Sequence, residues 1–373
     1  MATFLKAHQL DTHGARTLAG RNYTAPEIYA LELERIFQSR WLCAGRAAEI
    51  AKPGDFLTRE VGAESLIVTR DGSGTARAFY NVCRHRGTRI CEAAHGNFGE
   101  TIACPYHAWT YDLDGSLLGA PHMAGLEEFD KKDYPLHRAA IAEWEGFLFI
   151  NLATDPEPFT EAWRPMLGRF DHFQLPALRM HRRIEYDVAA NWKLIHQNYS
   201  ECYHCSPVHP QLVKLTPPTS GENDLFDGPF TGGFMEITAP GGSLTMSGNM
   251  CGVPISDVPT EGKQRAWYYS IFPNLLLSLL PDYALTHTIW PVAPGRTKLI
   301  CEWFFHPDTI ASGTFDPDDA VLFWDEVNRQ DWHVSELSQL GVASKMYAPS
   351  PYAPREGLAV QFDREVRRAL GEP

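Results

Sequence analysis

The chain has 373 residues. Chains of this length usually form more than one hydrophobic core, so the length favours two domains. Hydrophobic residues make up 44% and charged residues 21% of the chain, which excludes a large disordered tract. The formal net charge of −13 argues against nucleic acid and anionic membranes as partners, because binding to phosphate requires clustered Lys and Arg.

The first twenty residues are mixed and polar, without the apolar stretch of a secretory signal. The most apolar segment, residues 271–285, contains Pro273, Pro281 and Asp282, and it therefore predicts buried strands rather than a membrane span. Eight cysteines are too few for a disulfide scaffold in a chain of this length. Together these features predict a cytoplasmic protein with reduced thiols.

The first part of the chain, residues 1–44, is expected to be a helical lead-in that packs on the domain formed by residues 156–373. Thr24 to Glu27 match a capping box, and one helix face would be apolar, formed by Tyr29, Leu33, Ile36 and Phe37. From residue 45 to 155 short alternating segments are separated by Gly, Pro and Asp turns, which indicates a small β domain. Residues 141–152 are expected to close it as one final strand.

The remainder, residues 156–373, opens with a helical linker and mixes strands with helices. Strands are predicted at 182–190, 266–272, 275–280, 283–293 and 297–307. Two helices are predicted, near 191–204 and 317–340, the second with Asp316 as N-cap and Pro317 at its first position. This pattern is typical of an α+β domain with a largely antiparallel sheet.

Two motifs in the β domain, Cys83-x-His85 and Cys104-x2-His107, each place one thiolate and one imidazole in a short loop. In a Rieske [2Fe–2S] centre, one iron keeps two cysteines and the other takes two histidines. We therefore expect Cys83 and Cys104 on one iron, and His85 and His107 on the other.

A structural Cys₂His₂ zinc site is the alternative, since zinc binds the same atom types. Zinc fingers, however, usually pair two cysteines and then two histidines, and the flanking strings Cys-Arg-His-Arg-Gly and Cys-Pro-Tyr-His-Ala-Trp resemble those of Rieske loops. Cys91 and His95 lie between the motifs and are expected not to be ligands, because the four positions are already filled.

A second metal site is indicated by Glu201, His204 and His209. A helix would carry Glu201 and His204 on one face, and Pro207 would end it so that His209 folds back towards the same point. Two imidazoles and one carboxylate form the triad that leaves the opposite face of Fe(II) open for O₂.

The carboxylate is expected from the C-terminal helix, where the candidates are Asp325, Glu326, Asp331 and Glu336. We choose Asp331, because it lies four residues after Val327 and three before Val334, on an apolar and inward face. Cys202 and Cys205 flank His204 and could suggest zinc, but one such pair does not provide four ligands, so buried thiols are the simpler interpretation.

In combination these motifs resemble those of the oxygenase α subunits of the Rieske non-heme iron oxygenases, also called ring-hydroxylating oxygenases. The resemblance extends from residues 20–37 through the cluster loops and Asn191-Trp192-Lys193 to residues 328–331. It implies an all-β Rieske domain at 45–155 joined to a helix-grip, START-like catalytic domain at 156–373. It also implies a homotrimer in which the cluster of one subunit lies close to the iron of its neighbour.

In such proteins an acidic residue three before the first iron histidine bridges the two centres across the subunit interface, and this role carries over to Glu201. Most aromatic-ring dioxygenases have Asp there. With glutamate at position 201, the chain is therefore similar to the α-only branch that acts on quaternary amines. This branch includes choline monooxygenase, glycine betaine and stachydrine demethylases and carnitine oxygenase. The resemblance further implies O₂ as co-substrate and a separate reductase, sometimes with a ferredoxin.

Three functions remain open from the sequence. The first is a monooxygenase that hydroxylates or N-demethylates a small organic substrate, and the second is an oxygenase of aromatic compounds. The third is a Rieske electron carrier with a non-catalytic ligand-binding domain. A quaternary ammonium substrate would favour an aromatic cage, for which the candidates are Phe234, Trp267, Tyr268, Tyr269, Phe272, Tyr283, Trp290, Trp303 and Tyr347.

Overall fold

The structure is a computed structural model that describes residues 3–255, 257–259, 264–313 and 315–372. The chain divides into two compact units, one formed by Phe37–Trp163 and the other by Met1–Ile36 together with Arg164–Pro373. The lead-in expected over residues 1–44 is shorter, because β1 already begins at Leu42 and belongs to the first unit. Within the described part of the chain, no helix is both long and apolar enough to cross a bilayer.

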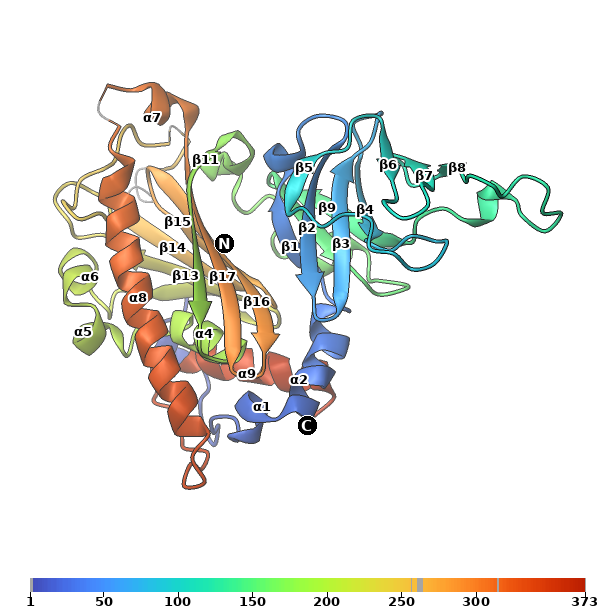
Figure 1. The fold of residues 1–373 in the computed structure, drawn as a ribbon. Coiled ribbons are helices and arrows are strands. Elements are labelled where there is room, and N and C mark those ends of the chain that lie inside the picture. The colour runs from blue at the N-terminus through green and yellow to red at the C-terminus, as the bar shows by residue number, and fades with distance from the viewer. Residues whose placement is uncertain (1–2, 256, 260–263, 314, 373) are drawn as a thin grey trace. The chain divides into compact units, whose positions relative to one another are not determined.

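The unit Phe37–Trp163 is built from antiparallel strands, as the alternating pattern predicts (Figure 1). Its larger sheet has the order β1-β10-β9-β4-β3-β2-β5, and a small sheet has the order β6-β7-β8. The strands are β1 Leu42–Arg46, β2 Asp55–Val61, β3 Glu64–Arg70, β4 Ala76–Tyr80, β5 His95–Asn97, β6 Thr101–Ala103, β7 Thr110–Asp112, β8 Leu117–Gly119, β9 Arg138–Trp144 and β10 Phe147–Asn151.

One prediction in this unit is wrong, because residues 141–152 form a hairpin rather than a single strand. The chain turns between β9 and β10 at Glu145 and Gly146, where φ is 50° and 73°. Two consecutive residues with positive φ form the tight turn whose twist suits antiparallel strands. The mostly apolar residues on both sides of this turn concealed it in the sequence.

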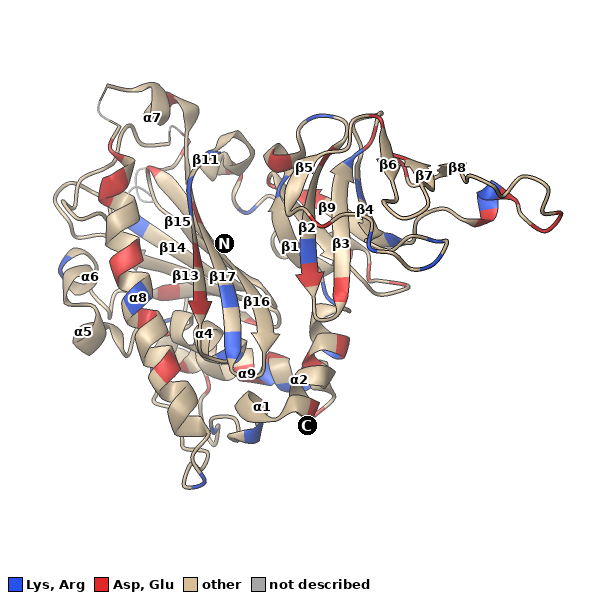
Figure 2. Cartoon of the chain, viewed as in Figure 1, with Lys and Arg blue, Asp and Glu red and all other residues tan. Residues whose placement is uncertain are grey.

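The second unit contains one seven-stranded antiparallel sheet with the order β11-β17-β16-β15-β14-β13-β12. The five predicted strands are confirmed, whereas β12 and β13 were not predicted. Figure 2 shows that β15 and β16 carry no Lys, Arg, Asp or Glu, consistent with the burial of β15 and of most of β16 in the sheet centre. The strands are β11 Arg179–Val188, β12 Glu222–Asp227, β13 Phe230–Glu236, β14 Arg265–Ile271, β15 Leu275–Leu279, β16 Tyr283–Ala293 and β17 Arg296–Phe305.

The long helix α8 packs on this sheet and begins at Pro317 with Asp316 as N-cap, as predicted, although the Asp316 side chain makes no capping bond. The helix ends at Val342, two residues later than predicted. A further helix, α9, was not predicted. The α-helices are α1 Arg21–Thr24, α2 Pro26–Glu32, α3 Phe159–Ala162, α4 Trp192–Tyr199, α5 Cys205–Val208, α6 Pro210–Leu215, α7 Pro307–Ala311, α8 and α9 Gly357–Leu370, and a π-helical turn follows α2 at Leu33–Phe37.

The predicted capping box at the start of the chain does not form. Thr24 is the last residue of α1, and its hydroxyl donates to the carbonyl of Gly20. Ala25 is the N-cap of α2, with Pro26 at the first helical position. The proline already starts the helix without a side-chain cap, because its φ is preset and it lacks the amide hydrogen that a cap would bind.

Candidate active site

The two Cys-x-His and Cys-x2-His loops of the β unit have similar backbones. In the first, the Gly87 amide donates to the carbonyl of Cys83, and in the second the Ala108 amide donates to that of Cys104. Cys83 and Cys104 are buried, whereas the histidine rings are partly exposed, with 3.1 Å between the Nδ1 atoms of His85 and His107. The loops therefore bring two thiols together on the inner side and two imidazoles together on the outer side.

This arrangement fits a two-iron cluster better than a single zinc ion. A tetrahedral zinc would hold all four donors about 3.5 Å apart. Among the described residues, however, only His204, His209 and Asp331 form a group of three or more His, Cys, Asp or Glu donors that all lie within 4.8 Å of one another. Donors in two separate pairs suit a [2Fe–2S] centre with one pair on each iron.

Neighbouring side chains support both halves of the cluster site. The Tyr111 hydroxyl lies 3.4 Å from Cys83 Sγ and accepts the Arg84 amide at 3.1 Å. Burial raises the pKa of the Cys83 thiol, and the adjacent Cys104 raises it further. Such thiols ionise when a metal replaces the proton. On the outer side, the ring of His85 stacks on Trp109 with 4.9 Å between centroids.

His204, His209 and Asp331, the residues that the sequence analysis chose as metal ligands, lie together in the structure. The Nε2 atoms of His209 and His204 lie 2.8 Å and 3.3 Å from the same carboxylate oxygen, Oδ1 of Asp331. The sequence predicted that α8 would supply the carboxylate, and Asp331 lies on this helix. Two imidazoles and one carboxylate at these distances fit a divalent iron with open positions.

Hydrogen bonds at the opposite ring nitrogens fix both histidines. His209 Nδ1 donates to Gln330 Oε1 at 2.7 Å, and His204 Nδ1 donates to Glu201 Oε1 at 2.7 Å. In the neutral rings that bind a metal, Nδ1 therefore keeps the proton, and Nε2, which faces Asp331, supplies the lone pair. Gln330 was missed by the sequence analysis, although its position beside Asp331 on α8 was visible.

The charges around His204 show that this site suits a cation. Burial lowers the pKa of His204, but the carboxylates of Asp331 and Glu201 outweigh it and raise this pKa to about 10. The pKa of Asp331 is lowered despite its burial, because both histidines stabilise the carboxylate. A bound divalent cation would neutralise these carboxylates in place of the protons.

The predicted helix over 191–204 is wrong in its second half. α4 ends at Tyr199, so Glu201 and His204 lie in a loop, and Pro207 lies within the short α5. The Glu201 carboxylate accepts hydrogen bonds from the backbone amides of Tyr203 and His204. A side chain that binds nearby amides in this way competes with helix formation.

The other residues weighed in the sequence lie elsewhere. Asp325 accepts the hydroxyl of Tyr186 at 2.7 Å, and Glu336 accepts the amide of Ala189 at 3.0 Å. Glu326 is exposed on α8. Cys91 is buried beside the cluster loops and His95 is exposed in β5. None of them belongs to the metal-binding group found among the described residues.

The expectation of free thiols at Cys202 and Cys205 is wrong, because the structure joins them in a disulfide with a Cα–Cα distance of 4.9 Å. This also removes the zinc interpretation of the pair. The disulfide closes the turn that contains His204, and it begins one residue after Glu201. It therefore constrains the loop that presents one metal ligand.

A cavity of about 430 Å³ adjoins the iron triad, within the range typical of small-molecule sites. Of the aromatic candidates from the sequence, Phe234 and Tyr268 line it, and Tyr199 and Trp324 join them. The Tyr199 hydroxyl lies 2.9 Å from Ser278 Oγ, and Trp324 Nε1 donates to the Tyr283 hydroxyl at 2.6 Å. Because their polar ends are engaged with the sheet, these two rings present carbon to the cavity.

Comparison with known proteins gives a family for each part of the chain. Residues 175–372 match the family model of the ring hydroxylating alpha subunit catalytic domain, and residues 40–130 match that of the Rieske [2Fe-2S] domain. The glycine betaine monooxygenase oxygenase subunit of Chromohalobacter salexigens is 30% identical over 91% of this chain and 82% of its own length. The carnitine monooxygenase oxygenase subunit of Acinetobacter baumannii is 39% identical over 50% of this chain and 51% of its own length.

Solved structures show the same architecture. The quaternary ammonium Rieske monooxygenase CntA superposes with a TM-score of 0.81 and 25% identity, covering 95% of each chain. Naphthalene 1,2-dioxygenase from Rhodococcus sp. has a TM-score of 0.77 at 21% identity, covering 95% of this chain and 94% of its own, which shows the shared fold.

The fold and the two sites define a Rieske-type terminal oxygenase, which uses a [2Fe–2S] cluster, a mononuclear iron and O₂. The chain belongs to the ring-hydroxylating oxygenase α-subunit family. Its relatives over most of the chain are described as oxygenase subunits of monooxygenases.

Proposed function

We propose that this oxygenase hydroxylates an N-methyl group of a small quaternary ammonium compound. The supporting observation is that the triad of His204, His209 and Asp331 adjoins a cavity lined by aromatic rings. Relatives along most of the chain are oxygenase subunits of glycine betaine monooxygenases. The substrate cation would then lie between these rings and the carboxylates of Glu201 and Asp331.

The proposed reaction balances with one O₂ and two electrons from the reductase. The quaternary ammonium ion R₃N⁺–CH₃, O₂, two electrons and two protons give R₃N⁺–CH₂OH and water. The C–N bond of this product then breaks to leave R₃N, formaldehyde and a proton. Where the carbon is not bound to nitrogen, the same oxygen insertion gives a stable alcohol.

In this proposal Cys83, His85, Cys104 and His107 would hold the cluster, and His204, His209 and Asp331 would hold the iron. When bound, these groups supply single electrons and O₂ activation. The chain's own contribution is orientation, because Glu201 and Gln330 fix the two iron histidines.

The aromatic wall suits a methylated cation for a physical reason. A cation over the face of Tyr or Trp gains about 2 kcal/mol when both are removed from water. Tyr199 and Tyr268 lie with 6.2 Å between ring centroids, and Tyr268 and Trp324 with 6.3 Å. The three rings therefore form a continuous apolar surface within the cavity.

For the assembly, we propose a homotrimer in the cytoplasm, supplied by a reductase and in some systems a ferredoxin. In such a ring Glu201 would also accept a hydrogen bond from a cluster histidine of the neighbouring subunit. Glu201 is suited to bridge two centres in this way, because its carboxylate already holds His204 of its own chain.

Turnover with two panels of compounds tests the substrate class. The enzyme, its reductase and NAD(P)H are incubated with methylated betaines and with methyl aryl ethers, and formaldehyde is measured. We expect formaldehyde from the betaines. Formaldehyde from the aryl ethers alone would overturn the proposal in favour of an aromatic oxygenase.

Substitution of Asp331 tests the ligand set. Asp331→Ala should lose the mononuclear iron and about 100-fold or more in turnover, because two histidines alone hold Fe(II) weakly. Iron analysis after anaerobic reconstitution should give about three irons per chain for the parent and about two for the variant, with an unchanged cluster spectrum. Glu326→Ala, on the exposed face of α8, is the matched control. Full iron content and turnover in Asp331→Ala would exclude Asp331 as a ligand.

A further inference from the structure

The N-terminal segment of residues 3–10, named here the strap, forms part of the wall of the active-site cavity. Leu5 extends the edge of the sheet, since its amide donates to the Asn223 carbonyl at 2.9 Å and its carbonyl accepts the Asn223 amide at 2.7 Å. Phe4 packs edge-on against Phe234, with 5.5 Å between ring centroids. Lys6, Ala7 and His8 follow and line the cavity.

The other end of the strap is held against α9. A Cβ atom at Gly357 would lie 2.6 Å from Cβ of Leu10 and 2.9 Å from the carbonyl oxygen of Ala7. The glycine therefore permits close contact between the strap and the start of α9. Arg355, two residues before this helix, also lines the cavity. Residues from both ends of the chain thus meet at one wall.

The lining residues differ in exposure, which distinguishes the mouth of the cavity from its depth. Lys6 and Arg355 are exposed, whereas His209 is 1% exposed and the Asp331 side chain 15% exposed. The cations therefore lie at the mouth and the iron triad lies inside. The same cavity also has the aromatic wall described above.

Lys6 and Arg355 are the only Lys or Arg side chains among the described residues that line the cavity, where the acidic lining residues are Glu201 and Asp331. Neither Lys6 nor Arg355 forms an ion pair with a carboxylate among the described residues. Two cations without a partner in the protein can accept an anionic group of a ligand.

We infer that Lys6 and Arg355 are specificity-determining residues that bind the carboxylate of a zwitterionic substrate at the cavity mouth while its N-methyl end points to the iron triad. This inference rests on the proposed function and deepens it. It assigns the enzyme to ammonium carboxylates rather than to ammonium alcohols, which have the same cationic end but no anion. An alcohol would leave both cations without a ligand charge.

Binding of two probes tests the inference without turnover. Glycine betaine or γ-butyrobetaine and choline are titrated into the anaerobic holoenzyme by calorimetry. Because both cations are exposed, Lys6→Gln and Arg355→Gln should each weaken carboxylate binding about 3- to 10-fold, and the double variant about 10- to 50-fold. Choline affinity should change less than about 2-fold. Lys214→Gln, an exposed lysine outside the cavity lining, is the matched control.

Kinetics and charge reversal provide a second readout. The double Gln variant should raise KM for the carboxylates with kcat nearly unchanged, because the contact is made equally in the ground and transition states. Arg355→Glu should reverse the preference towards choline. Equal effects on both probes, or none on the carboxylates, would overturn the inference and leave the proposed function standing. Absence of binding and turnover with every quaternary ammonium compound would instead overturn both.

Discussion

His196 lies on α4 behind the cavity wall, fully buried, with both ring nitrogens engaged. Nε2 lies 2.8 Å from the Pro273 carbonyl, which can only accept, so Nε2 carries the proton. Nδ1 then accepts from the Ser270 hydroxyl at 3.0 Å. Burial lowers the pKa of His196 to about 4, so the ring is neutral in the folded protein.

This pKa predicts a measurable pH dependence of stability. The unfolded chain, with a His pKa near 6.5, binds more protons than the folded one between about pH 6.5 and 4, so stability falls on acidification. His196 should contribute a slope of up to about 1.4 kcal/mol per pH unit. His196→Gln keeps a donor and an acceptor without titrating, and its thermal midpoint should fall less between pH 7 and 5.

The comparison between the parent protein and His196→Gln isolates the contribution of the His196 ring. Burial raises the pKa of Asp282 and of Asp363 to about 6, which gives the opposite slope below pH 6. Both aspartates remain in the variant, so their effect cancels in the difference. Parallel pH profiles of the two thermal midpoints would show that His196 does not titrate as inferred.

At the residue scale, the metal-binding residues were predictable from the sequence, whereas the residues that line the cavity were not. Asp331 could be selected because helical periodicity places it on an inward face, and the cluster motifs are local in sequence. Tyr199 and Trp324 were not selected as cavity residues, since their position depends on how α4 and α8 pack on the sheet. The same holds for Lys6, which reaches the cavity through pairing with a strand more than 200 residues away.

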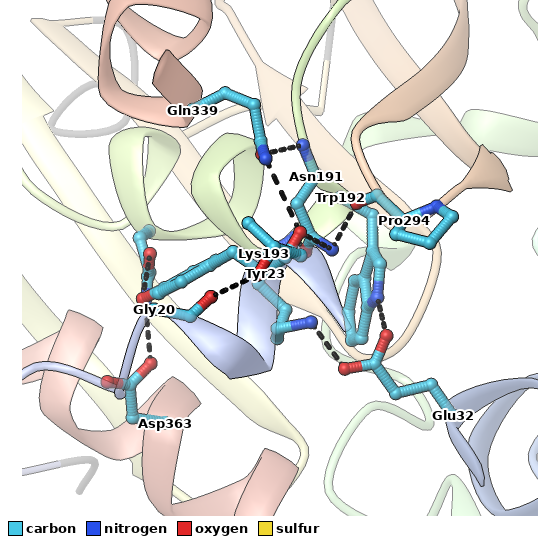
Figure 3. Close-up of polar contacts among 11 residues, drawn as sticks. Gly20, Tyr23, Glu32, Asn191, Trp192, Lys193, Pro294, Gln339 and Asp363 are labelled. Carbon is cyan, nitrogen blue, oxygen red and sulfur yellow. Dashed lines mark hydrogen bonds and ion pairs between the residues drawn. The ribbon is translucent and has the colours of Figure 1, made fainter. Parts of the chain in front are cut away.

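At the element scale, a buried ion pair joins α2 to α4 (Figure 3). The Lys193 ammonium and the Trp192 indole nitrogen both donate to the Glu32 carboxylate, and Glu32 and Lys193 are 0% exposed. Burial lowers the pKa of Lys193, and the Glu32 charge opposes this shift. The Asn191 side chain caps α4 and also donates to the carbonyl of Pro294. These bonds set the start of the helix that leads to the iron loop.

Removal of one partner from this pair should be costly. Lys193→Met leaves the Glu32 charge buried without its ammonium and should reduce the free energy of unfolding by about 3–5 kcal/mol. The double variant Glu32→Gln with Lys193→Met retains an acceptor for Trp192 and leaves no charge, so it should recover most of this loss. Denaturant unfolding of the two variants and the parent measures the coupling. A double variant as unstable as Lys193→Met would contradict this explanation.

Elements with a strong local pattern were predictable, whereas those defined by tertiary contacts were not. α8 has a proline start and sustained periodicity, so its first residue was predicted correctly. β12 is a half-buried edge strand with little alternation. α4 stops before Glu201 because that carboxylate binds the following backbone amides, a choice that helix propensity does not reveal.

At the scale of the whole molecule, Glu201 is the residue for which the proposed trimer predicts a role beyond its own chain. Glu201→Gln keeps the acceptor for His204 but removes the charge. If it also contacts the neighbouring subunit, oxidation of the reduced cluster should slow by about 10- to 100-fold. Stopped-flow absorbance of the cluster in a single turnover measures this rate, alongside mononuclear iron content.

The matched control is Glu356→Gln. Glu356 is a nearby acidic residue for which no role in electron transfer is proposed. Its pKa is raised by burial and then by Glu201, so the two carboxylates are neighbours. Loss of the mononuclear iron in Glu201→Gln would show that Glu201 acts only by holding His204 in its own chain. An unchanged rate with full iron content would place the electron path elsewhere.

The catalytic unit is discontinuous in sequence, which has a consequence for biosynthesis. Arg35 donates to the carbonyl of Leu370 at 2.6 Å, and the hydroxyls of Thr17 and Tyr347 lie 2.9 Å apart. Ribosomes add about 5–20 residues per second, so the lead-in waits roughly 17–67 s for these partners, which lie 330 and 335 residues further along the chain. The inserted β unit has all its strands long before then. Nascent chains should therefore carry a folded β unit at a time when the lead-in still lacks its C-terminal partners.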